Sequence, residues 1–153
     1  MEILQSGDDI CFDCTQEEYD ALWKHYFDME TDYAEIIAGI DADDQYLTSA
    51  AAFGNGIRIL RQDLWEMIVS FMISQNNNIK RITASVDLLC SRCGGVISQE
   101  DEAYAFPLPH EVTVDIFEDK TMGFGYRANY LLEIFDFARN NPNWVDNLRK
   151  MII

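Results

Sequence analysis

The chain has 153 residues, of which 48% are hydrophobic and 12% aromatic, which suits a folded domain with a core and argues against disorder. Its formal net charge of −16 disfavours attraction to nucleic acid or to anionic membranes. Acidic side chains are unevenly distributed, however. Residues 1–50 carry 14 acidic side chains and 1 basic one, whereas residues 51–100 carry 4 acidic and 5 basic ones. The middle of the chain could therefore still face a polyanion.

The first nine residues, MEILQSGDD, are acidic and lack the apolar segment of a secretory signal. No apolar run is long enough to span a bilayer, so we expect no membrane partner. Four cysteines in a chain without such a signal favour reduced thiols. These features together predict a cytoplasmic protein.

Residues 9–14 alternate enough to predict one short strand, and no second strand pattern lies close enough to pair with it as a hairpin. We expect either the last strand of a sheet that is otherwise missing or an extended lead-in. Thr15 and Glu18 have the spacing of a capping box, which predicts a helix from this point to about Phe27.

Three more helices are predicted before the middle of the chain. Residues 31–40 and 43–53 carry aspartates in their first turns, where the helix dipole favours acid, and they predict two short helices. Residues 57–63 predict extended or irregular chain. Asp63 then caps a strongly apolar helix, LWEMIVSFMIS.

An asparagine run, Asn76–Asn78, ends this helix, because the asparagine amide competes with the backbone for hydrogen bonds. A helix follows from about Ile79 to Arg92 and stops at Gly94–Gly95. Residues 95–120 are less regular. The last two predicted helices span about 127–140 and 142 to the end of the chain. The whole pattern predicts an all-α fold of roughly eight helices after one strand.

The four cysteines form two C-x-x-C pairs, Cys11 with Cys14 and Cys90 with Cys93. Zinc sites built from two such pairs usually place them about 15–20 residues apart, whereas some 75 residues separate these pairs. Cys93 also continues the apolar row of its helix. We therefore expect buried thiols that behave as small hydrophobic side chains, and no metal site.

No arrangement of residues suggests a nucleophile. His25 and His110 lack metal-ligand spacing, and Gly123–Gly125 is too short for a phosphate-binding loop and lacks the following lysine. We expect no cofactor.

The asparagine run has a further property. Asn76–Asn78 can cap the flanking helices, but Lys80 and Arg81 follow in the first turn of the next helix, where cations oppose the dipole. Free amides and basic side chains at a helix N-terminus suit phosphates or base edges. Tyr126 and Arg127, on a glycine-rich turn, could stack on a base and bond to it. These two segments are candidates for nucleic-acid contact.

Two stretches, FGNGIRILRQDLWEMIVSFMISQNNNIKRI and MGFGYRANYL, resemble the 8-oxoguanine DNA glycosylases of the helix-hairpin-helix superfamily. The resemblance runs in consistent order from about Ile10 to the last residue and covers the central portion of the family. It implies that residues 1–14 are the remaining strand of an N-terminal β domain. Residues 15–153 would then be a partial helical glycosylase domain that stops before the hairpin.

The family excises oxidised guanine opposite cytosine by base flipping and cleaves the strand as a lyase, so the resemblance implies DNA repair on double-stranded DNA with 8-oxoguanine opposite cytosine. By the same resemblance, Asn76 would fill the space of the extruded base. Arg81 and Arg127 would bond to the cytosine, and Tyr126 would be the aromatic wedge beside it. We call these four residues the cytosine-reading surface. Asn77 and Asn78 would hold the loop instead.

In the family, the helix that matches WVDNLRKMI leads into a Leu-Pro-Gly-Val-Gly hairpin, then the Schiff-base lysine and a catalytic aspartate. This chain contains none of these motifs, so we expect no catalytic residue and no activity from the chain alone. The resemblance also implies a bacterial, nucleoid-associated protein. The alternative is a non-catalytic all-α interaction module on the same scaffold, which the charge of −16 favours. No oligomeric state is predicted.

Overall fold

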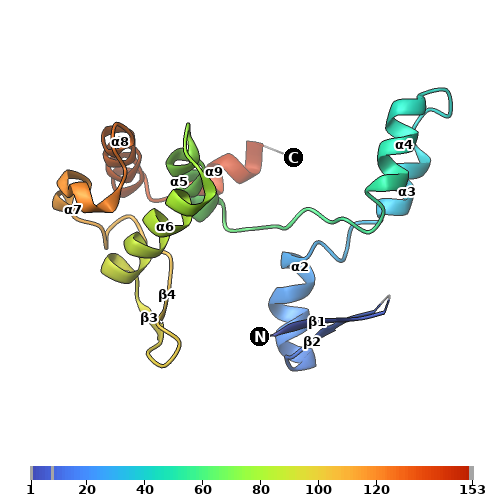
Figure 1. Ribbon diagram of the computed structural model, residues 1–153, viewed down its shortest axis with the longest axis horizontal. Coiled ribbons are helices and arrows are strands. Elements are labelled where there is room, and N and C mark those ends of the chain that lie inside the picture. Colours follow the sequence, from blue (N-terminus) through green and yellow to red (C-terminus); the bar gives the residue numbers. More distant parts are fainter. Residues whose placement is uncertain (1, 8, 152–153) are drawn as a thin grey trace. The chain divides into compact units, whose positions relative to one another are not determined.

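The computed structural model describes residues 2–7 and 9–151 and divides into two compact units, Met1–Gln62 and Asp63–Ile153 (Figure 1). Helices make up most of the regular secondary structure in both units, so the all-α prediction is confirmed, with two short antiparallel strand pairs in addition. Among the described residues, no helix has the length and apolar character that crossing a membrane requires.

A β-hairpin opens the first unit. Strand β1 (Ile3–Ser6) pairs antiparallel with β2 (Asp9–Phe12), so the prediction of a single strand is wrong. The sequence did not indicate strand β1, because β1 is exposed along its whole length and lacks the alternation of a half-buried strand. Gly7, with a φ of 64°, supplies the left-handed conformation that tight hairpin turns require.

The helical segments of the first unit are, in order, α1 (Gln16–Glu18), the π-helical η1 (Tyr19–Trp23), α2 (Lys24–Tyr26), α3 (Tyr33–Ala38) and α4 (Gln45–Phe53). The predicted capping box is confirmed: the Glu18 N–H donates to Thr15 Oγ1 (3.2 Å) and the Thr15 N–H donates to Glu18 Oε2 (2.8 Å). Asp32 and Asp44 cap α3 and α4 by accepting from backbone amides of the first turn. The predicted helix starts therefore agree with the structure within two residues in this unit.

Asp28, after α2, is buried and takes a left-handed conformation with a φ of 52°. Its carboxylate accepts hydrogen bonds from Thr31 Oγ1 (2.7 Å), Tyr33 Oη (2.8 Å) and Arg61 Nε (2.6 Å). The bond from Thr31, followed by those from Arg61 and Tyr33, lowers the pKa of Asp28 to about 2. This carboxylate ties the extended segment before Asp63 to the helices of the first unit.

We expect the free energy of unfolding of the first unit to decrease as the pH falls from about 4 to about 2. The pKa of Asp28 is about 2 in the folded state and 3.8 ordinarily, so the ionised carboxylate favours folding above the higher value and loses its effect below the lower one. Hydrogen exchange of residues 16–61 across this pH range measures the change. Asp28→Asn should flatten the dependence because an amide does not titrate, and an unchanged acid response in that variant would contradict the assignment.

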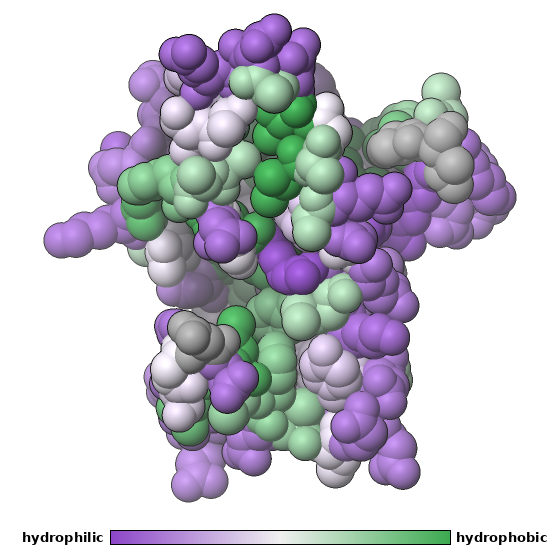
Figure 2. All heavy atoms as spheres, turned by 90° about the vertical axis from the view of Figure 1, so that its right-hand side faces the viewer, coloured by the Kyte–Doolittle hydropathy of each residue, from purple (hydrophilic) through white to green (hydrophobic). Residues whose placement is uncertain are grey.

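Many large apolar side chains stay exposed, and Phe53 at the end of α4 has 94% of its surface accessible. On the face shown in Figure 2, apolar side chains gather in patches between hydrophilic ones. Contiguous exposed apolar patches are typical of surfaces that contact other polypeptide.

The elements of the second unit are α5 (Leu64–Ser74), α6 (Ile79–Cys93), β3 (Val96–Ser98), β4 (Ala103–Tyr104), α7 (Val114–Glu118), the 3-10 helix η2 (Lys120–Met122), α8 (Arg127–Asn140) and α9 (Trp144–Met151). The four longest predicted helices of this region are confirmed within a few residues as far as residue 151, and the predicted continuation of the last one over residues 152–153 lies outside the described residues. Strands β3 and β4 form a second hairpin, with Val96 opposite Tyr104, in a region where the sequence predicted only irregular chain.

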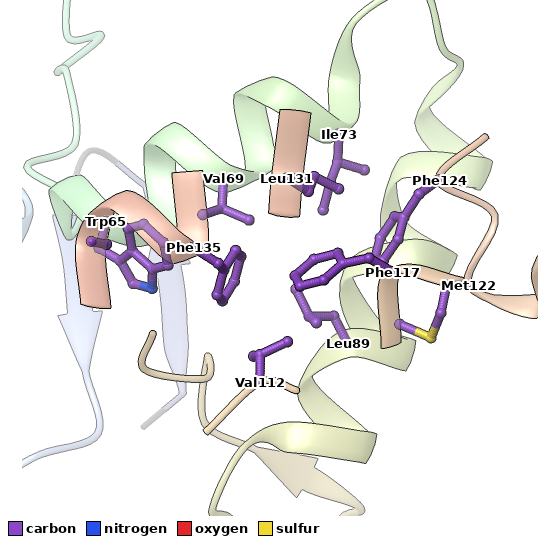
Figure 3. Packing of buried hydrophobic residues seen from close by; sticks show 11 residues of the cluster. Trp65, Val69, Ile73, Leu89, Val112, Phe117, Met122, Phe124, Leu131 and Phe135 are labelled. Carbon is purple, nitrogen blue, oxygen red and sulfur yellow. The ribbon is translucent and has the colours of Figure 1, made fainter. Parts of the chain in front are cut away.

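The core of the second unit lies between α5, α6, α7 and α8 (Figure 3). Trp65, Val69 and Ile73 recur every four residues and form the buried face of α5. The Phe135 ring of α8 lies 4.7 Å from the Trp65 ring, between centroids. Trp65 at the start of α5 contacts Phe135 far along α8, and Arg127 at the start of α8 donates to the Gln75 carbonyl directly after α5, so the two helices run antiparallel. The end of α5 and the start of α8 therefore meet.

The cysteines differ from one another in exposure. Cys90 and Cys93 of α6 are half-buried, and burial raises the pKa of both thiols. Cys93 packs against the core, as predicted. Cys11 is exposed on β2, however, so the expectation of a buried thiol is wrong there, because the hairpin leaves both of its faces largely uncovered.

Candidate nucleic-acid interface

The asparagine run connects α5 to α6, and its three amides have different environments. Asn77 Nδ2 donates to the Ile73 carbonyl (3.1 Å), and Asn78 Oδ1 accepts from the Arg81 N–H (3.1 Å) as the N-cap of α6. Asn76 is exposed and has a φ of 46°, a left-handed conformation that asparagine tolerates better than most residues. Asn77 and Asn78 thus hold the turn, and Asn76 sits at its surface.

Arg127, the first residue of α8, is buried with 5% of its surface exposed. Its guanidinium donates to three backbone carbonyls: Nε to Gln75 (2.6 Å), Nη2 to Asn76 (2.8 Å) and Nη1 to Phe124 (3.2 Å). A guanidinium has five N–H groups, so these bonds use three of them. Arg127 therefore joins the asparagine turn to the glycine-rich turn before α8.

Tyr126 lies next to Arg127 and is 55% exposed. Its hydroxyl contacts the Gln75 carbonyl at 3.4 Å, and the Arg127 guanidinium carbon lies 4.8 Å from the centre of its ring. Such cation–π stacking favours a fixed ring orientation. The aromatic side chain is thus presented at the surface beside Asn76.

The glycine-rich turn is anchored from the far end of α6. Arg92, in the last turn of that helix, makes an ion pair with Asp119 and donates to Thr121 Oγ1 (3.0 Å). Hydrogen bonding from Thr121 and then from Arg92 lowers the pKa of Asp119 to about 2. Gly123, with a φ of 72°, passes so close to Ser85 that an added Cβ would lie 3.0 Å from its Oγ. Sequence reasoning missed this anchor because 27 residues separate Arg92 from Asp119.

Lys80 and Arg81 are exposed in the first turn of α6. The structure brings Asn76, Tyr126 and Arg127 together, although Tyr126 and Arg127 lie some 50 residues further along the chain than Asn76. It places Arg81 five residues after Asn76, with its side chain at the surface.

Comparison with known proteins gives consistent matches. Residues 1–68 match the family model described as 8-oxoguanine DNA glycosylase, N-terminal domain. An N-glycosylase/DNA lyase of Saccharomyces cerevisiae is 38% identical over 132 residues, which is 79% of this chain and 33% of that protein.

Two crystal structures of the Clostridium acetobutylicum 8-oxoguanine glycosylase/lyase are 34% identical and cover 92% of this chain. The apo form has a TM-score of 0.80 over 50% of its own length, and the complex with double-stranded DNA containing cytosine opposite 8-oxoguanine has 0.77 over 49%. The chain belongs to the 8-oxoguanine DNA glycosylase family. It spans about a third of the yeast relative and half of the solved ones.

The family model ends at residue 68, in the first turns of α5. The asparagine turn and the Tyr126–Arg127 turn of this chain therefore lie beyond the segment that the family model matches. The two solved glycosylases are matched over 92% of this chain. Both turns lie in the second unit, and their hydrogen bonds to each other are internal to it.

Proposed function

We propose that this chain is the cytosine-reading part of a DNA glycosylase and lyase that removes oxidised guanine opposite cytosine by base flipping, in the service of DNA repair. The observation that carries the proposal is the set of hydrogen bonds from Arg127, because this one buried side chain fixes both candidate turns in a single surface. The domain assignment belongs to the same proposal: residues 1–14 are the remaining strand region, and residues 15–153 are the helical glycosylase domain. A bacterial, cytoplasmic location belongs to it as well.

Each residue has a role that its chemistry suits. Asn76 offers both an amide donor and an acceptor to the space left by the extruded base. Arg81, exposed, presents its whole donor fork to the N3 and O2 acceptors of cytosine, whereas Arg127 would use the two N–H groups that its carbonyl bonds leave over. Tyr126 would enter the duplex beside the cytosine as an apolar wedge.

The net charge favours the second candidate, a non-catalytic interaction module, because a chain of −16 repels a polyanion. Locally, however, Lys80, Arg81 and Arg127 give the two turns an excess of positive charge. Salt dependence discriminates the candidates: a glycosylase part should bind a duplex with a shallow salt slope and a preference for cytosine, and an interaction module should bind no duplex.

We predict that Arg81→Ala lowers the preference of the chain for cytosine opposite an abasic-site analogue by about tenfold, because a bidentate contact to a base is worth about 1–3 kcal/mol of discrimination. Binding to duplexes with cytosine or adenine at that position, followed by fluorescence anisotropy, measures the preference. Arg149→Ala on α9 removes the same charge away from both turns and serves as the control. An equal loss for both duplexes would place Arg81 on a phosphate and contradict the assignment.

We also expect the 153-residue chain alone to form no covalent adduct with an 8-oxoguanine duplex under borohydride. A lyase of this kind traps through an amine that attacks the sugar. The four lysines here lie outside the glycosylase motif: Lys24, Lys80, Lys120 and Lys150. Gel analysis after reduction detects an adduct, and a trapped species on this chain would contradict the expectation.

A further inference from the structure

Tyr126 is exposed, yet three neighbouring groups contact its side chain. The Gln75 carbonyl meets its hydroxyl, and the Arg127 guanidinium lies 4.8 Å from its centre. A third contact comes from Tyr130, whose ring centroid is 6.5 Å away at an interplanar angle of 85°. This edge-to-face arrangement is the one that aromatic quadrupoles favour.

Tyr130 follows Tyr126 by four residues, which places the two side chains on one face of α8. It is 52% exposed and lies outside the buried core, so packing in the core does not account for it. An exposed aromatic side chain contributes little to folding, but it restricts the rotamers of the ring beside it.

We propose that Tyr130 is a positioning residue that holds the Tyr126 ring in the orientation in which it enters the duplex beside the cytosine. This inference rests on the proposed function of the surface. A Tyr126 ring that is already oriented loses less side-chain entropy on binding. Its contact with the Tyr130 ring therefore increases the affinity for kinked DNA. The phenol hydroxyl of Tyr130 is not needed for this role.

The test compares Tyr130→Ala with Tyr130→Phe, which keeps the ring and removes the hydroxyl. Tyr130→Ala should weaken binding to a duplex with cytosine opposite an abasic-site analogue by about three- to tenfold, and Tyr130→Phe should bind like the unchanged chain. Tyr46→Ala is the control, because Tyr46 is an exposed tyrosine on α4 in the first unit. In Tyr126→Ala, the further change Tyr130→Ala should have almost no effect on binding.

Two results would overturn the inference. If Tyr130→Phe binds as weakly as Tyr130→Ala, the hydroxyl acts on DNA directly. If the losses from Tyr126→Ala and Tyr130→Ala add, the two rings act independently.

A DNA-free measurement separates this inference from the proposed function. In the unliganded protein, Tyr130→Ala should shift the ring-proton NMR signals of Tyr126 and average its rotamers. Should the unchanged chain show no preference for cytosine, the proposed function fails, and the NMR result alone decides whether Tyr130 orients Tyr126. Unchanged Tyr126 signals would refute the positioning role.

Discussion

Replacing Arg127 by alanine is expected to lower the free energy of unfolding of the second unit by about 3 kcal/mol, because hydrogen bonds to a charged group contribute about 1.5–3 kcal/mol each and are not additive. The side chain is buried and its three carbonyl partners lose a donor at once. Lysine should recover little, since an ammonium group lacks the planar fork that reaches three carbonyls. Urea unfolding monitored by tryptophan fluorescence measures the loss.

The fluorescence can be assigned to the second unit. Of the three tryptophans, Trp65 and Trp144 lie in it and Trp23 lies in the first unit, so a Trp23→Phe background leaves only the relevant signals. Arg81→Ala in the same background is the control, because Arg81 is exposed and its loss should leave stability unchanged. If both variants unfold at the same urea concentration, the carbonyl bonds of Arg127 do not stabilise the unit.

This contrast between the two arginines was not available from the sequence. Both were assigned to the cytosine by family resemblance, as equivalent donors. The structure distinguishes them, because two of the three carbonyls that accept from Arg127 belong to Gln75 and Asn76, some 50 residues earlier in the chain. Local patterns carry no information about partners so distant, and the burial of a charged residue depends entirely on such partners.

Signals within one turn of helix were predictable, in contrast. Thr15 and Asp63 were assigned as helix caps, and the run Asn76–Asn78 as a source of caps. Thr15, Asp63 and Asn78 each accept a hydrogen bond from the backbone N–H of the residue three positions later. These bonds depend only on residue type and spacing. Strands β1 and β3 were missed because their burial patterns show no alternation of buried and exposed residues. The division of the helical region after Gln62 likewise depends on long-range packing.

Gly94→Ala is expected to destabilise the second unit by about 3 kcal/mol or more, although the sequence suggested only that Gly94 and Gly95 stop a helix. A Cβ on Gly94 would lie 1.8 Å from the Ala105 carbonyl oxygen and 2.8 Å from that of Cys90. Both neighbours are backbone atoms, so relief requires moving the chain that follows β4, and overpacking of this severity costs at least as much as the 1–3 kcal/mol usual in cores.

Gly95→Ala provides the matched comparison, because nothing lies within 4 Å of the Cβ position at Gly95. It should leave stability unchanged or raise it slightly, since alanine restricts the unfolded chain more than glycine does. Urea unfolding in the Trp23→Phe background measures both variants. Equal midpoints would mean that the close approach of Gly94 to Ala105 is absent in solution. A loss confined to Gly94→Ala would establish that the helix end is fixed by the backbone packed against it, and not by the flexibility of two adjacent glycines.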